Sequence, residues 1–214
     1  MSRSPVRMAT YDEVKRRIDK YRQLSMDDRV LQRYKEHEHI LGRVVAQQVS
    51  DDGEFNAHQQ RLVDKFLIIN DSEKLLKIEE KFRGAIYPCF YIDAWVKWPN
   101  SERWFPGYGI NPAASCDYFA FVWHSLDWEM LLFERIAFQT AVMWLMKNAE
   151  EEHTRFAPWS EEQVKKRRKI VRSIKVPWGV LLKVYERNGG RNAREIGQKV
   201  RHIQSLQRAK KRTA

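Results

Sequence analysis

Cysteine is scarce in this chain of 214 residues, which contains only Cys89 and Cys116. The two do not form a C-x-x-C pair, so neither a disulfide-rich secreted scaffold nor a cysteine-built zinc site is expected. Isolated thiols are typical of a reducing compartment, and we therefore predict a cytoplasmic location. A chain of this length can bury a full hydrophobic core without disulfides.

Long hydrophobic runs are absent as well. The most apolar stretch, residues 130–146, is interrupted by Glu134, Arg135 and Gln139. The opening residues, MSRSPVRMAT, contain no apolar segment of the kind that a signal peptide needs. We therefore expect no signal peptide, no membrane-spanning helix and no membrane partner.

What the chain has in excess is positive charge. It contains 39 Lys and Arg against 28 Asp and Glu, a net charge of +11. Residues 161–214 alone contain 17 basic and 4 acidic side chains, a net +13, so residues 1–160 sum to −2. The excess therefore belongs to the last quarter of the chain, and a polyanion such as nucleic acid is its natural partner.

The hydrophobic pattern predicts an α/β protein. Helical periodicity and capping residues predict helices over residues 11–23, 26–48, 127–148 and 161–174, and three short ones over 180–185, 193–200 and 203–208. Aromatic and β-branched runs predict a β-hairpin over residues 63–83 and strands over 89–96 and 117–123. The last of these is apolar on both faces and should be a buried central strand. We expect one domain over residues 1–158 and a basic helical C-terminal extension over 159–214.

The hairpin should bring charged side chains together. Alternate residues of a strand lie on one face, so Glu79 and Lys81 point the same way and Glu80 points the other way. Asp64 opens the preceding strand, and if the strands pair through a turn near Asp71 it lies close to Glu79. Two carboxylates and one amine are therefore expected at one place.

This grouping suits hydrolysis of a phosphodiester. The carboxylates of Asp64 and Glu79 and the backbone carbonyl of Glu80 would give Mg²⁺ or Mn²⁺ a set of hard oxygen ligands. Bound metal acidifies a water and neutralises charge on the phosphate, and Lys81 would position or activate that water. Arg83, on the same face, would bind a phosphate.

These residues resemble the motif of the PD-(D/E)XK nuclease superfamily, which is D-(x)n-(D/E)-x-K on a β-hairpin followed by an aromatic strand and a long helix. Asp64 matches the lone Asp, and residues 79–81, Glu-Glu-Lys, match E-x-K. Val63 stands where the name-giving Pro would be, and the motif is short, since residues 13–15, Glu-Val-Lys, match E-x-K by chance. The similarity covers roughly residues 30–147.

The resemblance implies a restriction-endonuclease-like fold, with a central mixed β-sheet flanked by helices. It implies a Mg²⁺-dependent deoxyribonuclease, in the simplest case an endonuclease. An upstream helix adds an acidic metal ligand in some members, which Glu38 or Glu36 would supply here. Because many nucleases need two active sites to cut both strands, a homodimer stays open.

Other polar and aromatic residues give weaker signals. The run Glu36-His37-Glu38-His39 has no usual zinc spacing, and consecutive helical residues point about 100° apart, so a solvated helix edge is expected. Asp93 could replace Asp64 or add a ligand, and His124 closes the central strand, but structural roles are commoner for both. Cys116 has no patterned His partner, which argues against a thiol nucleophile. The tryptophans, Trp95, Trp98 and Trp104, either stack on bases or, more commonly, pin a loop to the core.

The basic tail predicts docking to a phosphate backbone. The residues concerned are Lys165, Lys166, Arg167, Arg168 and Lys169, with a second cluster at 208–212. The pattern favours DNA without excluding RNA. Two alternatives remain: a non-catalytic nucleic-acid-binding protein whose hairpin is scaffold, and an assembly protein whose Trp-rich loop recruits a partner.

Overall fold

The computed structural model describes residues 19–20, 22–49, 64–69, 74–97, 102–148, 160–164 and 169–213. Its helices are α2 (Asp28–Glu36), α3 (Glu38–Leu41), α5 (Arg135–Asn148), α6 (Trp178–Arg187) and α7 (Ala193–Thr213). Its strands are β1 (Val44–Val49), β2 (Lys65–Ile69), β3 (Lys74–Phe82), β4 (Cys89–Lys97), β5 (Trp104–Pro106), β6 (Tyr118–Trp123), β7 (Glu129–Glu134), β8 (Ser160–Val164) and β9 (Lys169–Pro177). No helix in this part of the chain combines the length and the apolarity needed to cross a membrane.

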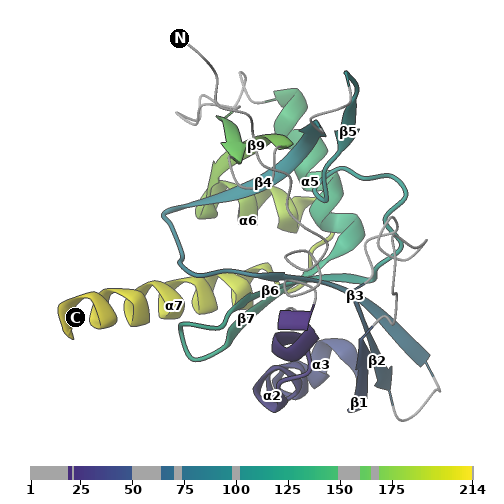
Figure 1. The fold of residues 1–214 in the computed structure, drawn as a ribbon, viewed down its shortest axis with the longest axis vertical. Coiled ribbons are helices and arrows are strands. Elements are labelled where there is room, and N and C mark those ends of the chain that lie inside the picture. The colour runs from purple at the N-terminus through teal and green to yellow at the C-terminus, as the bar shows by residue number, and fades with distance from the viewer. Residues whose placement is uncertain are drawn as a thin grey trace.

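The strands form two sheets. One has five strands in the order β1-β2-β3-β6-β7, and it is mixed because β3 and β6 run parallel while its other neighbours are antiparallel. The other has four antiparallel strands in the order β5-β4-β9-β8. Helices α2 and α3 cover one face of the five-stranded sheet, and α5, α6 and the second sheet lie on its other face (Figure 1). The prediction of an α/β protein with a central mixed sheet flanked by helices is confirmed at this level.

Strand β6 is buried on both faces, as its sequence predicts. Phe119, Phe121 and Trp123 point into the larger core, which lies between the two sheets and includes residues of α5 and α6. Ala120 and Val122 alternate with them and point into the smaller core beneath α2 and α3. The strand is central because apolar side chains on both faces must be covered by other elements.

The predicted hairpin is also confirmed. Strands β2 and β3 pair antiparallel from Lys65 opposite Ile78 to Ile69 opposite Lys74, while the turn at 70–73 lies outside the described residues. The predicted strand at 89–96 is present as β4, but it belongs to the second sheet.

The predicted helix over 26–48 is wrong in its second half. The helix begins after its N-cap Asp27, whose side chain accepts a hydrogen bond from the N–H of Arg29. The helix breaks at His37 and ends before Gly42, which has φ 86°, a conformation that glycine adopts without strain. The residues that follow, Val-Val-Ala-Gln-Gln-Val, form β1 because β-branched side chains favour a strand.

The predicted helix over 127–148 is wrong at its start. Residues 129–134 form β7, which pairs antiparallel with β6, and the helix α5 begins only at Arg135. Asp127 and Trp128 have φ of 53° and 56° and form the tight turn between the two strands. A short apolar run fits a buried strand as well as a buried helix, so periodicity alone does not separate them.

The basic helix predicted over 161–174 is wrong, because those of its residues that the structure describes form β8 and β9. Strand β9 pairs with β4 from Pro177 opposite Cys89 to Ile170 opposite Lys97. Residues on both sides of the predicted boundary at 158 therefore share one sheet, and α6 and α7 contribute to the same core as β6. The C-terminal part of the chain is packed against the rest, not appended to it.

The C-terminal helices also differ from the prediction of three short ones. They are α6 and one long helix, α7, which spans both of the predicted helices at 193–200 and 203–208. The end of α7 projects beyond the body of the molecule (Figure 1), and residues 208–212 on it are exposed. Of the predicted phosphate-docking residues, Lys165, Lys166, Arg167 and Arg168 lie outside the described residues, and Lys169 begins β9 without a described side chain.

Candidate functional site

Two hydrogen bonds to the backbone of β3 hold Asp64 beside Ile78 and Glu80. Its N–H donates to the carbonyl of Ile78 at 2.8 Å, which continues the pairing of β2 with β3 by one residue. Its carboxylate oxygen Oδ2 accepts from the N–H of Glu80 at 2.9 Å. The hairpin register thus places Asp64 next to the Glu79–Glu80 pair, as the sequence predicts.

Glu79 and Lys81 share the face of β3 that points toward the second sheet. The Lys81 ammonium donates a hydrogen bond to the carboxylate of Glu79, and Glu79 is only 3% exposed. Burial lowers the pKa of Lys81, and the nearby Asp64 carboxylate opposes that change. The positive charge of Arg83 adds to the lowering of the Lys81 pKa. The structure therefore brings Asp64, Glu79 and Lys81 together, with Arg83 within electrostatic reach.

Glu80 points to the opposite face, into the core beneath α2. Its carboxylate accepts from the Tyr34 hydroxyl at 2.6 Å and from the Ser25 hydroxyl, and it pairs with Lys65 Nζ at 2.9 Å. The backbone of Glu80 faces Asp64, because its N–H donates to the Asp64 carboxylate. The N–H and C=O of one strand residue point toward the same neighbouring strand. The Glu80 carbonyl therefore points toward the Asp64 side of β3, past the start of β2 at Lys65.

Tyr108 joins the site from a loop and was not predicted from the sequence. The Lys81 ammonium lies 5.7 Å from the centre of its ring, and Arg83 donates to its hydroxyl at 3.2 Å. A Cβ on Gly107 would approach the carbonyl of Asp93 to 2.3 Å, so only glycine lets this loop lie against β4. The signal in the sequence was the Gly-Tyr-Gly run itself, in which an aromatic residue stands between two glycines.

A cavity of about 570 Å³ opens beside Arg83. Its lining includes Arg83, which directly follows β3, Asp93 and Tyr91 of β4, and Ser173 of β9. Asp93 accepts a hydrogen bond from the Ser173 hydroxyl at 3.1 Å, and its charge acts on Lys81. The cavity therefore lies between Arg83 and the second sheet, and Asp93 in its wall is within electrostatic reach of Lys81.

The remaining predicted residues do not join this group. The carboxylate of Glu38 accepts from the N–H of Val44 at the start of β1, and Glu36 pairs with Arg33. His124 is exposed beyond the end of β6. Cys116 is buried, and burial raises the pKa of its thiol to about 12, which does not suit a nucleophile.

Two further expectations concern the aromatic residues and the histidine run. Trp95 packs against the larger core, and Trp104 lies under the guanidinium of Arg172 at 4.1 Å, while Trp98 lies outside the described residues. The expectation of a solvated helix edge at 36–39 is wrong for His37, which is 2% exposed because the helix breaks there.

The donors around Asp64 are all oxygens: two carboxylates and, by its direction, one carbonyl. This set fits a hard cation such as Mg²⁺ and does not offer the nitrogen or sulfur ligands that zinc prefers. No protein-family model, curated protein or solved structure matches the chain. A function for this chain is therefore argued from the geometry of its own residues.

Proposed function

We propose that this protein is a metal-dependent nuclease that hydrolyses phosphodiester bonds in DNA. The observation that supports this most is the grouping of Asp64, Glu79 and Lys81 at one end of the β2–β3 hairpin, beside a cavity lined by Arg83. Two carboxylates and an amine beside a guanidinium match the charges that hydrolysis of a phosphodiester requires.

Asp64, Glu79 and the carbonyl of Glu80 would hold Mg²⁺ or Mn²⁺ in this proposal. The bound ion would acidify a water and neutralise charge on the phosphate. Glu79 is suited to the role because it is buried, and Lys81 is its one hydrogen-bonding partner among the described residues. A carboxylate that is almost free of water keeps its remaining lone pairs for a ligand.

Lys81 would position the attacking water, and in its neutral amine form it would take up the proton of that water. Its amine is held beside Glu79 and above the Tyr108 ring, and burial lowers its pKa. A lysine with a lowered pKa is more often in the neutral amine form near neutral pH than an exposed lysine is, and only that form can accept a proton. When a phosphate enters the site, its negative charge would draw the Lys81 ammonium away from the Glu79 carboxylate.

Arg83 would bind the phosphate. Its Nε is buried, and no hydrogen-bond partner for it is found among the described residues. Its guanidinium lines the cavity, where it can donate to a phosphate oxygen. The exposed basic end of α7, residues 208–212, would add contacts to the DNA backbone farther away. Both cysteines are free, in agreement with the reducing cytoplasm that we propose as its location.

A cleavage assay with supercoiled, linear, branched and RNA substrates tests the proposal. We expect nicking or cutting with Mg²⁺, none with EDTA, and an activity loss of about 100-fold or more in Lys81→Ala, the usual size for loss of a proton-transfer group. Lys81→Ala should still bind DNA. Lys77→Ala is the matched control, because Lys77 lies on the same face of β3 and is exposed. Full activity in both Lys81→Ala and Asp64→Asn would refute the assignment.

A non-catalytic nucleic-acid-binding protein is the second candidate. The exposed basic end of α7 favours it, because those side chains could bind phosphates without any cleavage site. It predicts DNA binding that weakens steeply with salt, no metal-dependent cleavage, and unchanged affinity in Lys81→Ala. The same set of substrates distinguishes the two candidates.

A further inference from the structure

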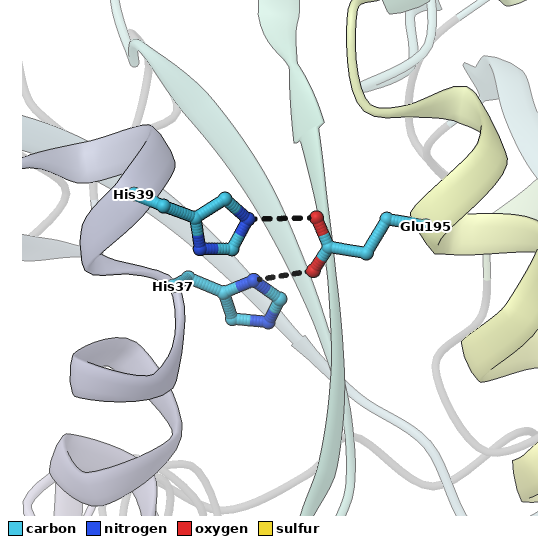
Figure 2. A group of neighbouring side chains, drawn as sticks. All are labelled: His37, His39 and Glu195. Carbon is cyan, nitrogen blue, oxygen red and sulfur yellow. Dashed lines mark hydrogen bonds and ion pairs between the residues drawn. The ribbon is translucent and has the colours of Figure 1, made fainter.

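Two histidines and a glutamate from distant parts of the chain meet on the outer side of the molecule. His37 lies at the break between α2 and α3, His39 is in α3, and both rings face Glu195 of α7 (Figure 2). His37 Nδ1 is 3.2 Å from one carboxylate oxygen, and His39 Nε2 is 2.9 Å from the other. One ligand atom from each residue lies within 4.8 Å of the other two.

The two distances run to different carboxylate oxygens, and an adjustment of the side chains would place one donor of each residue around a single transition-metal ion. Donors that each lie about 2.0–2.1 Å from a tetrahedral Zn²⁺ are about 3.3 Å apart from one another. The break in the helix is what makes the arrangement possible, because it turns His37 and His39 toward the same carboxylate. Two imidazoles and one carboxylate suit Zn²⁺, Co²⁺ or Ni²⁺ better than Mg²⁺.

His37 supplies an independent sign of a ligand. It is 2% exposed, and its Nδ1 forms no hydrogen bond within the described part of the chain, although Glu195 lies 3.2 Å away. A buried ring nitrogen normally has a hydrogen-bond partner. A nitrogen that faces a carboxylate without the alignment of a hydrogen bond is placed as one ligand faces another across an ion.

We propose that His37, His39 and Glu195 form a binding site for a divalent transition-metal ion of the zinc class, separate from the Asp64–Glu79 site. Three protein ligands leave the remaining coordination position to water or a small anion. That position would face a cavity of about 500 Å³, whose lining includes His39, Glu195, Arg191 and Arg194. The ion would join the helical segment before β1 to α7.

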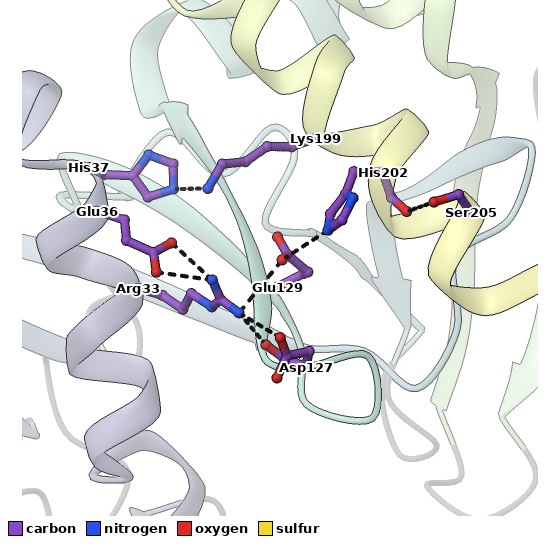
Figure 3. A network of polar contacts seen from close by, with 8 residues as sticks. All are labelled: Arg33, Glu36, His37, Asp127, Glu129, Lys199, His202 and Ser205. Carbon is purple, nitrogen blue, oxygen red and sulfur yellow. Dashed lines mark hydrogen bonds and ion pairs between the residues drawn. The ribbon is translucent and has the colours of Figure 1, made fainter. Parts of the chain in front are cut away.

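Other polar contacts link α2 to α7 without an ion. Arg33 of α2 pairs with Glu36 and reaches the backbone carbonyl of Asp127 at 2.6 Å, and Glu129 lies between Arg33 and His202 of α7 (Figure 3). The ligands are therefore brought together by contacts that do not depend on the metal. Such preorganisation lowers the cost of binding.

Lys199 opposes the site and gives a specific test of it. Its ammonium lies 3.1 Å from His37 Nε2 (Figure 3). A histidine that binds metal through Nδ1 carries its proton on Nε2, and that N–H would then face a cation. Binding must displace Lys199, and a side chain that accepts this hydrogen bond instead should strengthen the site.

The experiment measures binding of Zn²⁺ to the full chain after removal of metals, by titration calorimetry, with Co²⁺ as a visible-absorption probe. We expect one Zn²⁺ per chain and a rise in Tm of about 5–10 °C at a hundredfold excess over Kd. His37→Ala, His39→Ala and Glu195→Ala should weaken binding by at least about 100-fold. Lys199→Gln should tighten it by about tenfold, because the amide oxygen accepts from Nε2–H. His124→Ala, an exposed histidine beyond the end of β6 and outside this network, is the control and should bind as the unaltered protein does.

Two outcomes would overturn the proposal: no saturable Zn²⁺ binding, or binding that is equally strong in His39→Ala and Glu195→Ala. His39 is 59% exposed, so its replacement leaves the fold intact even if that of His37 does not. The result is independent of the proposed nuclease. Lys81→Ala should bind Zn²⁺ normally, and His39→Ala should keep its Mg²⁺-dependent cleavage.

Discussion

Glu79 and Glu80, two neighbouring residues of β3, are equally buried but differ in the face of the sheet that they occupy and in their number of partners. Glu79 is 3% exposed and Glu80 is 1% exposed, but they point to opposite faces of the sheet. The Glu80 carboxylate accepts hydrogen bonds from the hydroxyls of Ser25 and Tyr34 and forms an ion pair with Lys65. Among the described residues, Glu79 has one such partner, Lys81, whose side chain is 29% exposed.

The closed face, defined by Glu80, Lys65, Tyr34 and Ser25, is satisfied by its own neighbours. Lys65 also donates to Gln47 Oε1 at 2.8 Å and to the carbonyl of Ser25, so both charges of the pair are fully hydrogen-bonded. On the open face, defined by Glu79, Lys81 and Asp64, the Glu79 carboxylate has more acceptor capacity than its hydrogen bond from Lys81 uses. Burial by itself therefore does not distinguish a structural carboxylate from a functional one, whereas the number of partners does.

Replacing each glutamate by leucine gives the largest contrast. Glu80→Leu leaves the Lys65 ammonium, which is 0% exposed, without a counter-charge, and should lower the free energy of unfolding by about 3–5 kcal/mol. Glu79→Leu leaves a lysine that can reach water, and should cost less than about 1 kcal/mol. Urea unfolding at neutral pH measures both. Equal losses would mean that the two faces are energetically alike.

A double-mutant cycle sharpens the same contrast. Lys65→Met combined with Glu80→Leu removes both buried charges, so the pair should be far less destabilised than the sum of the single changes. We expect a coupling energy of about 2–3 kcal/mol for this pair, and below about 1 kcal/mol for Glu79→Leu with Lys81→Met. Chemical unfolding of all four single and both double variants gives these values. Additive effects at Lys65 and Glu80 would contradict the closed network.

The sequence was sufficient to predict the open face but not the closed one. Asp64, Glu79 and Lys81 lie within one hairpin, where strand alternation and antiparallel pairing fix which side chains meet. The hydroxyl partners of Glu80 lie far along the chain, on Ser25 before α2 and on Tyr34 within it, and no local pattern specifies how this segment docks. Local periodicity shows which face is apolar, and it does not show which distant element covers that face.

The same limit explains the errors in secondary structure. Residues 129–134 and 169–174 were predicted as helix, but they form strands because β6 and β4 offer them a paired edge. The capping residues that predicted a helix from residue 161 do not outweigh such pairing. The zinc-class site was missed for a related reason: His37 and His39 meet only because the helix breaks between α2 and α3, and Glu195 comes from the far end of the chain.

Tyr34→Phe tests the closed face with the smallest change and adds a pH dependence. Loss of the 2.6 Å bond to Glu80 should cost about 1–2 kcal/mol at pH 7, because Ser25 and Lys65 still bind the carboxylate. Burial and the charge of Glu80 raise the pKa of Tyr34 well above its usual value.

Above about pH 10 the unfolded chain loses this phenolic proton while the folded chain keeps it, so the stability of the unaltered protein falls as pH rises. Phenylalanine has no such proton, and the stability gap between the two proteins should therefore narrow above pH 10. Urea unfolding at pH 7, 9 and 10.5 measures the gap, and the other tyrosines cancel in the difference. A gap that stays constant would show that the Tyr34 hydroxyl does not depend on Glu80 in the way that the closed network requires.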